Sequence, residues 1–436
     1  MKLSGWGNFL GIDAQVSRPL NEINAIEAIL KSQQDNKPLI ARGLGRSYGD
    51  SALAAKIMMT SGLDHFLAFN EMTGELTCQA GVSLATILEV FVPKGWFLKV
   101  TPGTKFVTVG GAIASDVHGK NHHIDGCFSS HVTSLKIATV TQGVVECTRD
   151  KNSDLFFTTC GGMGLTGIIL EATFKLMPIV SAYVEQTTFK ANTLNEALAL
   201  FDEHHDAHYS VAWIDCLATG DNLGRSLIML GEHAKQGELV LKPKKTLNMP
   251  ITMPSFLLNQ YAIQAFNYLY YHKVRQVKSK QLVTYESFFY PLDAINNWNR
   301  MYGSKGFCQY QFVIPKAAGL AGMRAVLERI ATSKRGSFLA VLKAFGPQNK
   351  NFLSFPMEGY TLALDFKVDA GLFELLDELD NIVLAYGGRV YLTKDARMST
   401  QVFKKSYSQL EDFLTVRKKF GADNVFHSLQ SKRLGI

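Results

Sequence analysis

Three glycine-rich segments, roughly 60 residues apart, constrain the fold of this chain more than any other feature. They are RGLGRSYGD (42–50), PGTKFVTVGGAIASDVHGKNHH (102–123) and CGGMGLTGI (160–168). Glycine lets a backbone approach a ligand closely because it carries no side chain. In the second segment the small residues run directly into a cluster of imidazoles and one ammonium, which supply donors, charge and titratable groups. The segments therefore predict a ligand cradle that opens onto a reaction site.

The composition narrows the class of protein. The 436 residues allow more than one compact unit, because single cores stop growing at roughly 250–300 residues. The net charge of +7 comes from cations spread along the chain, which favours an anionic ligand or a membrane surface over nucleic acid. The six cysteines form no C-x-x-C pair, so we expect reduced, buried thiols. No apolar run reaches the ~18 residues of a membrane-spanning helix. We expect a cytoplasmic protein, either free or peripheral on a membrane, with the periplasmic face as the alternative location.

Residues 1–179 predict an α+β unit built around the ligand. Hydrophobic periodicity and capping residues predict helices at 21–32 and from Ser83 to about Phe91. Strands are expected at 38–41, 66–69, 75–79, 169–177 and as a pair within 131–148.

Residues 180–388 predict a second domain. Strands are expected at 209–216, 226–230, 308–314, 337–345 and 361–366, with helices at 317–332 and 370–385. This pattern favours one antiparallel sheet with helices on one face. From residue 389 the chain returns to the first domain with a strand and a helix near 407–420. We therefore expect a domain of 1–179 with 389–436, and a substrate-binding domain of 180–388.

Residues 244–283 combine aromatic and basic side chains. Two prolines, Pro250 and Pro254, precede the apolar residues Phe256, Leu257, Leu258, Tyr261, Phe266, Tyr268, Leu269, Tyr270 and Tyr271. Lys273, Arg275, Lys278 and Lys280 follow. Aromatic residues beside cations suit a membrane interface or a lipid-like ligand, which predicts a mobile lid here. The alternative is a packed helix with a solvated basic end.

The first glycine segment departs from a Rossmann loop. The third glycine of that pattern would stand at position 48, which is Tyr48, and no acidic residue follows at the required distance. NAD binding through a Rossmann unit is therefore disfavoured. Backbone N–H groups of this loop could still hold phosphate oxygens, with Arg42 and Arg46 neutralising charge, and a simple glycine turn is the alternative.

The three segments, in this order, resemble the FAD-binding half of the vanillyl-alcohol-oxidase-type (PCMH-type) flavoproteins. The resemblance runs nearly end to end through GWG (5–7), ARGLGRSYGD (41–50), VGGAIASDVHGKNHH (109–123), GLTGII (164–169), AWID (212–215), YPLD (290–293), WNRMYG (298–303), QYQFVIP (309–315), FGP (345–347), LSFP (353–356), GGRVYLTKDAR (387–397) and RKKF (417–420). It implies a two-domain flavoprotein. Relatives often attach flavin through a histidine in the first glycine loop, and that loop has none here, so non-covalent FAD is expected.

The resemblance also implies which residues hold FAD. Segments 43–49 and 108–116 would hold the pyrophosphate, and 161–167 the adenine side. The expected cofactor-binding residues are Arg42, Gly43, Leu44, Gly45, Arg46, Ser47, Tyr48, Gly49, Pro102, Gly103, Thr104, Thr108, Gly110, Gly111, Ala114, Ser115, His118, Gly119, Asn121, Gly161, Gly162, Gly164, Leu165, Gly167, Ile168 and Lys394.

Two of these residues are expected to be catalytic. By family position His118 faces the flavin ring and the sugar, and Lys394 lies near the flavin. Lys394 either stabilises negative charge on the flavin or takes the alcohol proton. A surface lysine at a strand end is the alternative. The substrate-facing residues are expected to be Tyr48, Trp213, Phe289, Gln309, Gln311 and Lys343.

His118, His122 and His123, with Asp116 and Asp125 nearby, also raise the question of a metal site. No further ligand stands at a suitable spacing, so no metal is expected.

Three positions depart from the family pattern. Ala363 replaces a cysteine, Phe289 a tyrosine and Leu429 an aspartate.

We expect an FAD-dependent oxidoreductase that oxidises a secondary sugar hydroxyl. Within the family, the resemblance favours the 2′-OH of a polyprenylphosphoryl-β-D-ribose, giving the 2-keto intermediate of epimerisation to arabinose for cell-wall arabinan. An NADH-dependent short-chain reductase would be the partner, and residues 244–283 would meet the lipid. The alternatives are oxidation of a soluble alditol, aldonolactone or specialised-metabolite sugar, and a binding protein without catalysis.

Overall fold

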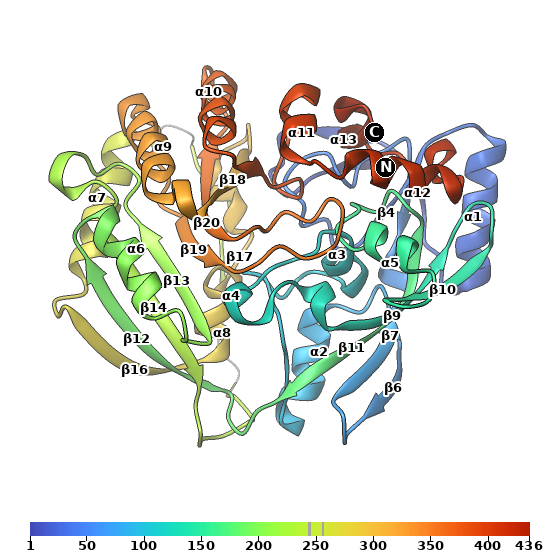
Figure 1. The fold of residues 1–436 in the computed structure, drawn as a ribbon, viewed down its shortest axis with the longest axis horizontal. Coiled ribbons are helices and arrows are strands. Elements are labelled where there is room, and N and C mark those ends of the chain that lie inside the picture. The colour runs from blue at the N-terminus through green and yellow to red at the C-terminus, as the bar shows by residue number, and fades with distance from the viewer. Residues whose placement is uncertain (243–245, 255–256) are drawn as a thin grey trace.

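The computed structural model describes residues 1–242, 246–254 and 257–436. Residues 244–245 and 255–256 of the predicted lid lie outside the described residues. Two sheet-based parts face each other, with the helices of the second glycine segment between them (Figure 1). All six cysteines are free and buried, as predicted.

The first part holds a six-stranded antiparallel sheet and a small parallel sheet. The six strands run in the order β10-β9-β11-β7-β6, with β8 paired to β11, and the three parallel strands in the order β3-β5-β4. The predicted helices are confirmed, with Asn21 and Ser83 accepting backbone N–H groups as N-caps. The elements are β1 (Lys2–Ser4), β2 (Gly11–Asp13), β3 (Gln15–Ser17), α1 (Glu22–Gln34), β4 (Leu39–Arg42), β5 (Lys56–Met59), β6 (Phe66–Asn70), β7 (Glu75–Gln79), α2 (Leu84–Phe91), β8 (Trp96–Leu98), α3 (Val109–Ala114), α4 (His122–Asp125), β9 (Val132–Ala138), β10 (Val144–Thr148), α5 (Ser153–Thr159) and β11 (Ile168–Pro178).

The second part is one antiparallel sheet of eight strands in the order β16-β12-β14-β13-β19-β20-β18-β21. Helices α6, α9 and α10 cover one face of it, so the expected arrangement is confirmed (Figure 1). The elements are β12 (Tyr183–Ala191), α6 (Leu194–Glu203), β13 (Tyr209–Ile214), β14 (Ser226–His233), β15 (Leu247–Asn248), α7 (Gln260–His272), β16 (Lys278–Thr284), α8 (Tyr285–Phe289), β17 (Ile295–Asn296), β18 (Phe307–Pro315), α9 (Gly319–Ser333), β19 (Ala340–Phe345), β20 (Gly359–Lys367), α10 (Leu372–Ala385) and β21 (Arg389–Val390).

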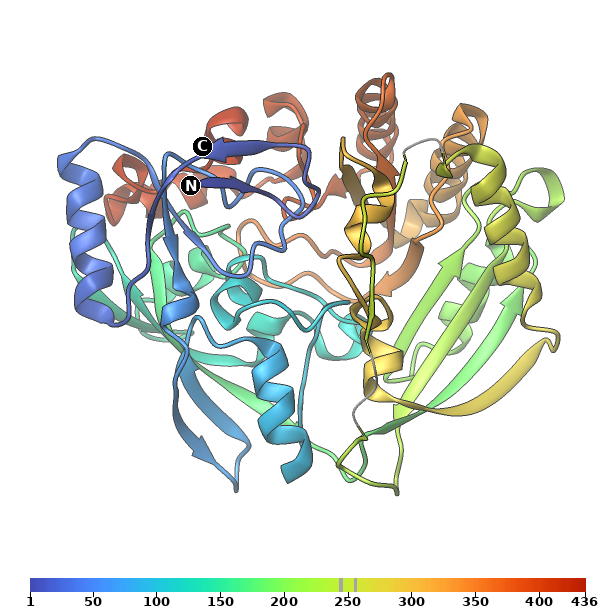
Figure 2. The ribbon, with the colours of Figure 1, turned by 180° about the vertical axis from the view of Figure 1, so that it is seen from behind.

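The C-terminal segment returns to the first part through α11 (Thr400–Ser406), α12 (Leu410–Lys419) and α13 (Leu429–Leu434). Phe426 forms a parallel bridge with Leu39, and the two chain ends lie side by side (Figure 2). Strand β21, which the sequence assigned to the first domain, pairs with β18 and so extends the second sheet. Pairing through β18 places the return into the first part after Val390.

The two parts share an apolar core and are also joined by buried hydrogen bonds to Asp116. One buried apolar cluster joins Ile40 and Leu53 of the first part to Ile214 and Tyr310 of the second. Asp116, fully buried after α3, accepts hydrogen bonds through Oδ2 from Ser354 Oγ (2.6 Å), and from the side-chain amides of Asn349 and Asn351 (2.7 Å each). The cradle is thereby tied to the loop that follows β19.

The described part of 244–283 forms a helix and an edge strand. Helix α7 buries Ile263, Asn267 and Tyr271, while Tyr261, Tyr268 and Leu269 are exposed. Among the described residues no helix is both long enough and apolar enough to cross a bilayer.

Candidate active site

A cavity of about 570 Å³ lies between the two parts. Residues of all three glycine segments form one side of it, and strands of the second sheet form the other. The expected site residues that line it are Gly43, Leu44, Gly45, Arg46, Ser47, Tyr48, Pro102, Gly103, Thr104, Thr108, Gly110, Gly111, Ala114, Ser115, His118, Gly119, Gly164, Gly167, Trp213, Phe289, Gln309, Gln311, Lys343 and Lys394. Residues more than 200 positions apart in sequence therefore meet at one site.

Seven expected cofactor residues do not line this cavity: Arg42, Gly49, Asn121, Gly161, Gly162, Leu165 and Ile168. They build the wall behind it. The Arg42 guanidinium donates to the Ser4 carbonyl (2.7 Å), and the Asn121 amide donates to the Lys99 carbonyl (2.7 Å). Leu165 and Ile168 are buried in apolar clusters. Gly49, Gly161 and Gly162 lie against backbone atoms, where a side chain would not fit freely.

His118 follows α3 and is buried in the cavity wall. The Gln311 side-chain amide donates to His118 Nε2 (3.1 Å) and to Thr361 Oγ1 (3.3 Å). Thr361 fixes this orientation, because its only hydroxyl proton goes to the Phe312 carbonyl (2.7 Å) and its oxygen must accept. His118 therefore carries its proton on Nδ1, which has no hydrogen-bond partner among the described residues. Burial, and then the nearby Lys343, hold the pKa of His118 well below its usual range, so the ring is neutral.

Gln309 lies two residues earlier on β18, on the same strand face. Its amide donates to Asp365 Oδ1 (2.6 Å) and to Tyr48 Oη (3.3 Å), and the Tyr302 hydroxyl donates to Asp365 Oδ2 (3.3 Å). Both N–H groups of Gln309, like those of Gln311, are thus used inside the protein. The amide oxygens are what these side chains can offer a ligand. The wall is therefore suited to accept hydrogen bonds from hydroxyl groups.

Three half-buried amines face the cavity. Lys394 Nζ lies 4.2 Å from the centroid of the Tyr48 ring. Burial lowers the pKa of Lys394, an effect that the neighbouring Asp365 carboxylate opposes. Burial, and then Lys343, lower the pKa of Lys120 to about 7, and burial and Lys394 lower that of Lys343 to about 7. Amines of this kind can take up or release a proton near neutral pH.

Aromatic side chains of the second part complete the wall. Trp213 on β13 donates from Nε1 to the Phe338 carbonyl (3.1 Å), and its ring centroid lies 4.7 Å from that of Tyr270 on α7. Tyr270, Lys273 and the buried Phe289 also line the cavity. The cavity therefore extends along an apolar wall to the helix that carries the exposed aromatic residues.

Comparison with known proteins now defines the family. Residues 14–148 match a FAD binding domain. The chain is 36% identical to decaprenylphosphoryl-beta-D-ribose oxidase of Mycolicibacterium smegmatis, over 99% of this chain and 97% of that protein. This chain belongs to the decaprenylphosphoryl-β-D-ribose oxidase family. It is an FAD-dependent oxidoreductase that acts on CH–OH groups.

More distant similarities agree with this assignment. L-gulonolactone oxidase of Bos taurus is 26% identical over 47% of this chain and 46% of that protein. The structure of Physcomitrella patens BBE-like 1 superposes with a TM-score of 0.67 at 16% identity, covering 94% of this chain and 89% of that one. At that identity the likeness concerns the fold alone, and it confirms the two-part flavoprotein architecture.

The cavity of this family member fits FAD. A Cβ on Gly103 would meet nothing within 4 Å, so the glycine leaves room in the cavity, whereas a Cβ on Gly43 would overlap Thr108 Oγ1. The Arg46 guanidinium lies 4.0 Å from the centroid of the Trp6 ring, and its buried Nε has no hydrogen-bond partner in the described part of the chain. A pyrophosphate could accept from such a donor.

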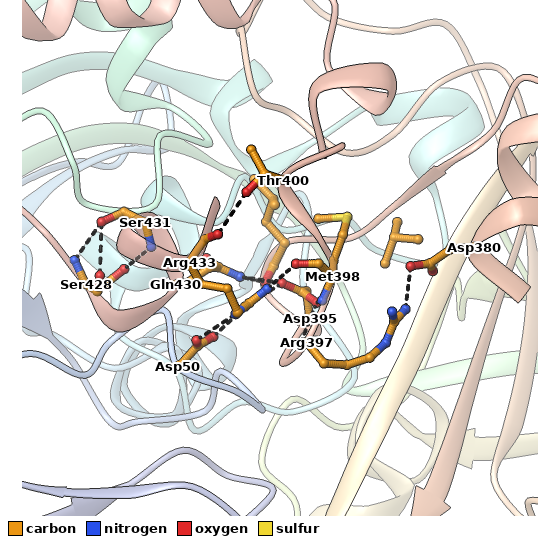
Figure 3. Close-up of polar contacts among 12 residues, drawn as sticks. Asp50, Asp380, Asp395, Arg397, Met398, Thr400, Ser428, Gln430, Ser431 and Arg433 are labelled. Atoms are coloured by element: carbon orange, nitrogen blue, oxygen red, sulfur yellow. Dashed lines mark hydrogen bonds and ion pairs between the residues drawn. The ribbon is translucent and has the colours of Figure 1, made fainter. Parts of the chain in front are cut away.

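An ion-pair network joins α13 to Asp50 and to Asp395, the residue that follows Lys394 in the sequence (Figure 3). Arg433 of α13 donates to Asp50 at 2.9 Å and 3.1 Å and to Asp395 Oδ2 at 2.8 Å. The Gln430 amide donates to the Leu392 carbonyl (2.7 Å). The C-terminal helix thereby joins the end of the first glycine segment to the turn that carries Lys394.

The histidines that follow His118 have structural partners. His122 Nδ1 accepts from the Gly346 backbone N–H (3.1 Å), and His123 Nε2 lies 2.8 Å from the Ala207 carbonyl oxygen. Burial, and then Lys343, lower the pKa of His122 to about 3. Among the described residues, no group of three or more His, Cys, Asp or Glu side chains could hold a metal ion.

Several residues of the site were missed in the sequence. Asp365 was detectable as the single charge in the apolar run TLALDF (361–366). Asp116, Thr361 and Arg433 act through partners far away in the chain, and no local pattern marks them.

Of the departures from the family pattern, Ala363 lies opposite Gln311 in the sheet and lines the cavity, as Phe289 does. Leu429 instead begins α13 and donates its backbone N–H to the Leu53 carbonyl (2.7 Å).

Proposed function

We propose that this protein oxidises the C2′ hydroxyl of a polyprenylphosphoryl-β-D-ribose to a ketone. The observation that carries the proposal is the cavity in which the glycine segments meet two acceptor amides and three amines. The full-length similarity to a decaprenylphosphoryl-β-D-ribose oxidase supports the substrate class. We assign FAD binding to residues 1–179 and 389–436, with β21 as part of the second sheet, and substrate binding to residues 180–388.

The hydrogen bonds and protonation states of the polar side chains in the cavity favour a separate role for each of them. FAD, held non-covalently by the glycine segments and Arg46, supplies a hydride acceptor when bound. Gln309 and Gln311 accept hydrogen bonds from sugar hydroxyls through their amide oxygens. Lys394 takes the proton of the C2′ hydroxyl, because burial favours its neutral amine. Neutral His118 accepts from the Gln311 amide through Nε2 and so orients that side chain, whose oxygen accepts from the sugar.

The product needs a second enzyme. Oxidation at C2′ removes the configuration of that carbon, and reduction from the opposite face restores a hydroxyl with the inverted configuration. An NADH-dependent short-chain reductase would perform this step and complete the epimerisation to arabinose. We place the oxidase in the cytoplasm and peripheral on the membrane, because the cavity wall continues to the exposed aromatic residues of α7.

Anaerobic titration with farnesylphosphoryl-β-D-ribose tests this function. The flavin absorbance near ~450 nm should bleach, and mass spectrometry should find a product lighter by two hydrogens. L-gulono-1,4-lactone and a soluble alditol are the comparison substrates. Bleaching by either of these, without bleaching by the phosphoryl ribose, would overturn the proposed substrate.

A further inference from the structure

Within the described residues, two of the cavity amines have no acidic partner. Lys120 comes from the loop between α3 and α4, and Lys343 comes from β19, so the two halves of the molecule contribute one each. Lys120 Nζ donates to the Phe288 carbonyl and lies 4.3 Å from the centroid of the Phe288 ring. Lys343 Nζ lies 5.8 Å from the centroid of the Phe345 ring. In the described part of the chain neither forms an ion pair with a carboxylate.

The charged neighbours of these amines are other bases. Lys343 opposes the charging of Lys120, and Lys394 opposes that of Lys343. His118 and His122 face Lys343 as neutral rings, since burial, and then Lys343, lower the pKa of each. The Asp365 carboxylate acts on Lys394 and is held by Gln309 and Tyr302. Among the described residues, these amines therefore have no compensating carboxylate, and a buried charge without one is costly.

We propose that Lys120 and Lys343 form an anion subsite that binds the phosphodiester of the lipid-linked sugar and takes up protons as it binds. The inference rests on the proposed function and names the group that distinguishes this substrate from a neutral lactone or alditol. Lysine ammonium groups bind phosphate oxygens as point charges. Phe288, Phe289 and Trp213 line the same cavity, so an apolar tail can leave the phosphate along an aromatic wall.

Proton uptake follows from the lowered pKa values of the two amines. Both amines have a pKa of about 7 because burial disfavours their charged forms. An anion favours the charged forms and raises both pKa values. By linkage, the phosphodiester should bind with uptake of up to about two protons at pH 8 and close to none at pH 6. Affinity is therefore full below pH 7 and falls as the pH rises above it.

Calorimetric titration of the FAD-loaded enzyme tests the subsite. The probe is farnesylphosphoryl 2-deoxy-β-D-ribose, which has no C2′ hydroxyl to oxidise. Titrations at pH 6 and pH 8, each in two buffers of different ionisation enthalpy, count the protons. The variants Lys120→Met and Lys343→Met should each remove about one proton of the uptake at pH 8, and should weaken binding at pH 6 about 10- to 100-fold. Lys405→Met, at an exposed position of α11, should bind as the wild type does.

A second ligand separates phosphate recognition from a structural role. The uncharged farnesyl 2-deoxy-β-D-riboside lacks only the phosphate, so its affinity should be the same in both variants and the wild type. Equal weakening for both ligands, or pH-independent binding without proton uptake, would overturn the subsite. Inorganic phosphate that binds as tightly as the phosphodiester would overturn its assignment to the lipid-linked group. If the ribose substrate is oxidised but the probe binds without proton uptake, the subsite is refuted and the proposed function stands. If the probe binds with proton uptake but the ribose substrate is not oxidised, only the proposed function is refuted.

Discussion

Lys394 is the residue on which the proposed chemistry depends most. Replacement by methionine keeps the stem of the side chain and removes the amine, so FAD should still bind. We expect anaerobic flavin bleaching by farnesylphosphoryl-β-D-ribose to slow by about 100-fold or more. The wild-type rate at saturating substrate should rise with pH, because the neutral amine accepts the proton, and this rise should be absent in Lys394→Met. Stopped-flow absorbance measures both.

The control separates chemistry from assembly of the site. Lys405→Met should match the wild type in rate, and the flavin content of Lys394→Met should equal that of the wild type. A Lys394→Met enzyme with the wild-type rate and pH profile would assign the proton to another group.

For single residues, the sequence predicted which side chains would line the site better than it predicted which residues would form hydrogen bonds with them. His118, Gln309, Gln311 and Lys394 all line one cavity, and their catalytic and binding roles stay predictions. Strand alternation shows that Gln309 and Gln311 share a face, but it does not show which strand lies beside them. The pairing of Gln309 with Asp365 depends on the register of β18 against β20, which is set by the whole sheet.

Among the elements, α13 supplies a test of how the turn of Lys394 is held. Arg433→Met would leave Asp50 and Asp395 buried without their cation, which should cost about 3–5 kcal/mol of unfolding free energy. The loss should be larger at pH 8 than at pH 5. Without the guanidinium both carboxyl pKa values rise, and protonation at low pH relieves the penalty. Thermal unfolding at the two pH values measures it.

A half-exposed arginine serves as the matched comparison. Arg324 faces Glu328 at 4.0 Å one turn along α9, and Arg324→Met should cost less than about 1 kcal/mol at either pH. If Arg433→Met behaved in the same way, the network would not hold the turn.

Helix α7 supplies the test of membrane contact. Leu269 on α7 and Ile23 on α1 are 68% and 67% exposed, so a glutamate at either position disturbs packing equally little. Leu269→Glu should weaken co-sedimentation with phosphatidylglycerol-containing vesicles about 10- to 100-fold, because an apolar contact with the bilayer is lost. Ile23→Glu should bind as the wild type does. Equal effects of the two substitutions would refute contact through α7.

The elements themselves were largely predictable because periodicity and caps are local. Five strands of the second sheet and the covering helices α9 and α10 were anticipated in this way, whereas β12, β16 and α6 were not. Strand β21 (Arg389–Val390) shows the limit, since a strand of two residues can join either sheet, and pairing with β18 decides. Residues 244–283 show another limit. Their composition indicated aromatic and basic surfaces, but not that α7 would bury Ile263 and Tyr271 while exposing Leu269.

For the molecule as a whole, the shared core predicts cooperative unfolding of the two parts. Apolar side chains of both parts form one buried cluster, and Asp116 accepts hydrogen bonds from the loop of the second part. FAD at about 1,000 times its dissociation constant should stabilise this unit by about 4 kcal/mol. Calorimetry should therefore show one transition that FAD shifts upward as a whole. Asp116→Ala should diminish the shift, because it removes the acceptor that joins the parts. Two transitions, of which FAD moves only one, would show that the parts are energetically independent.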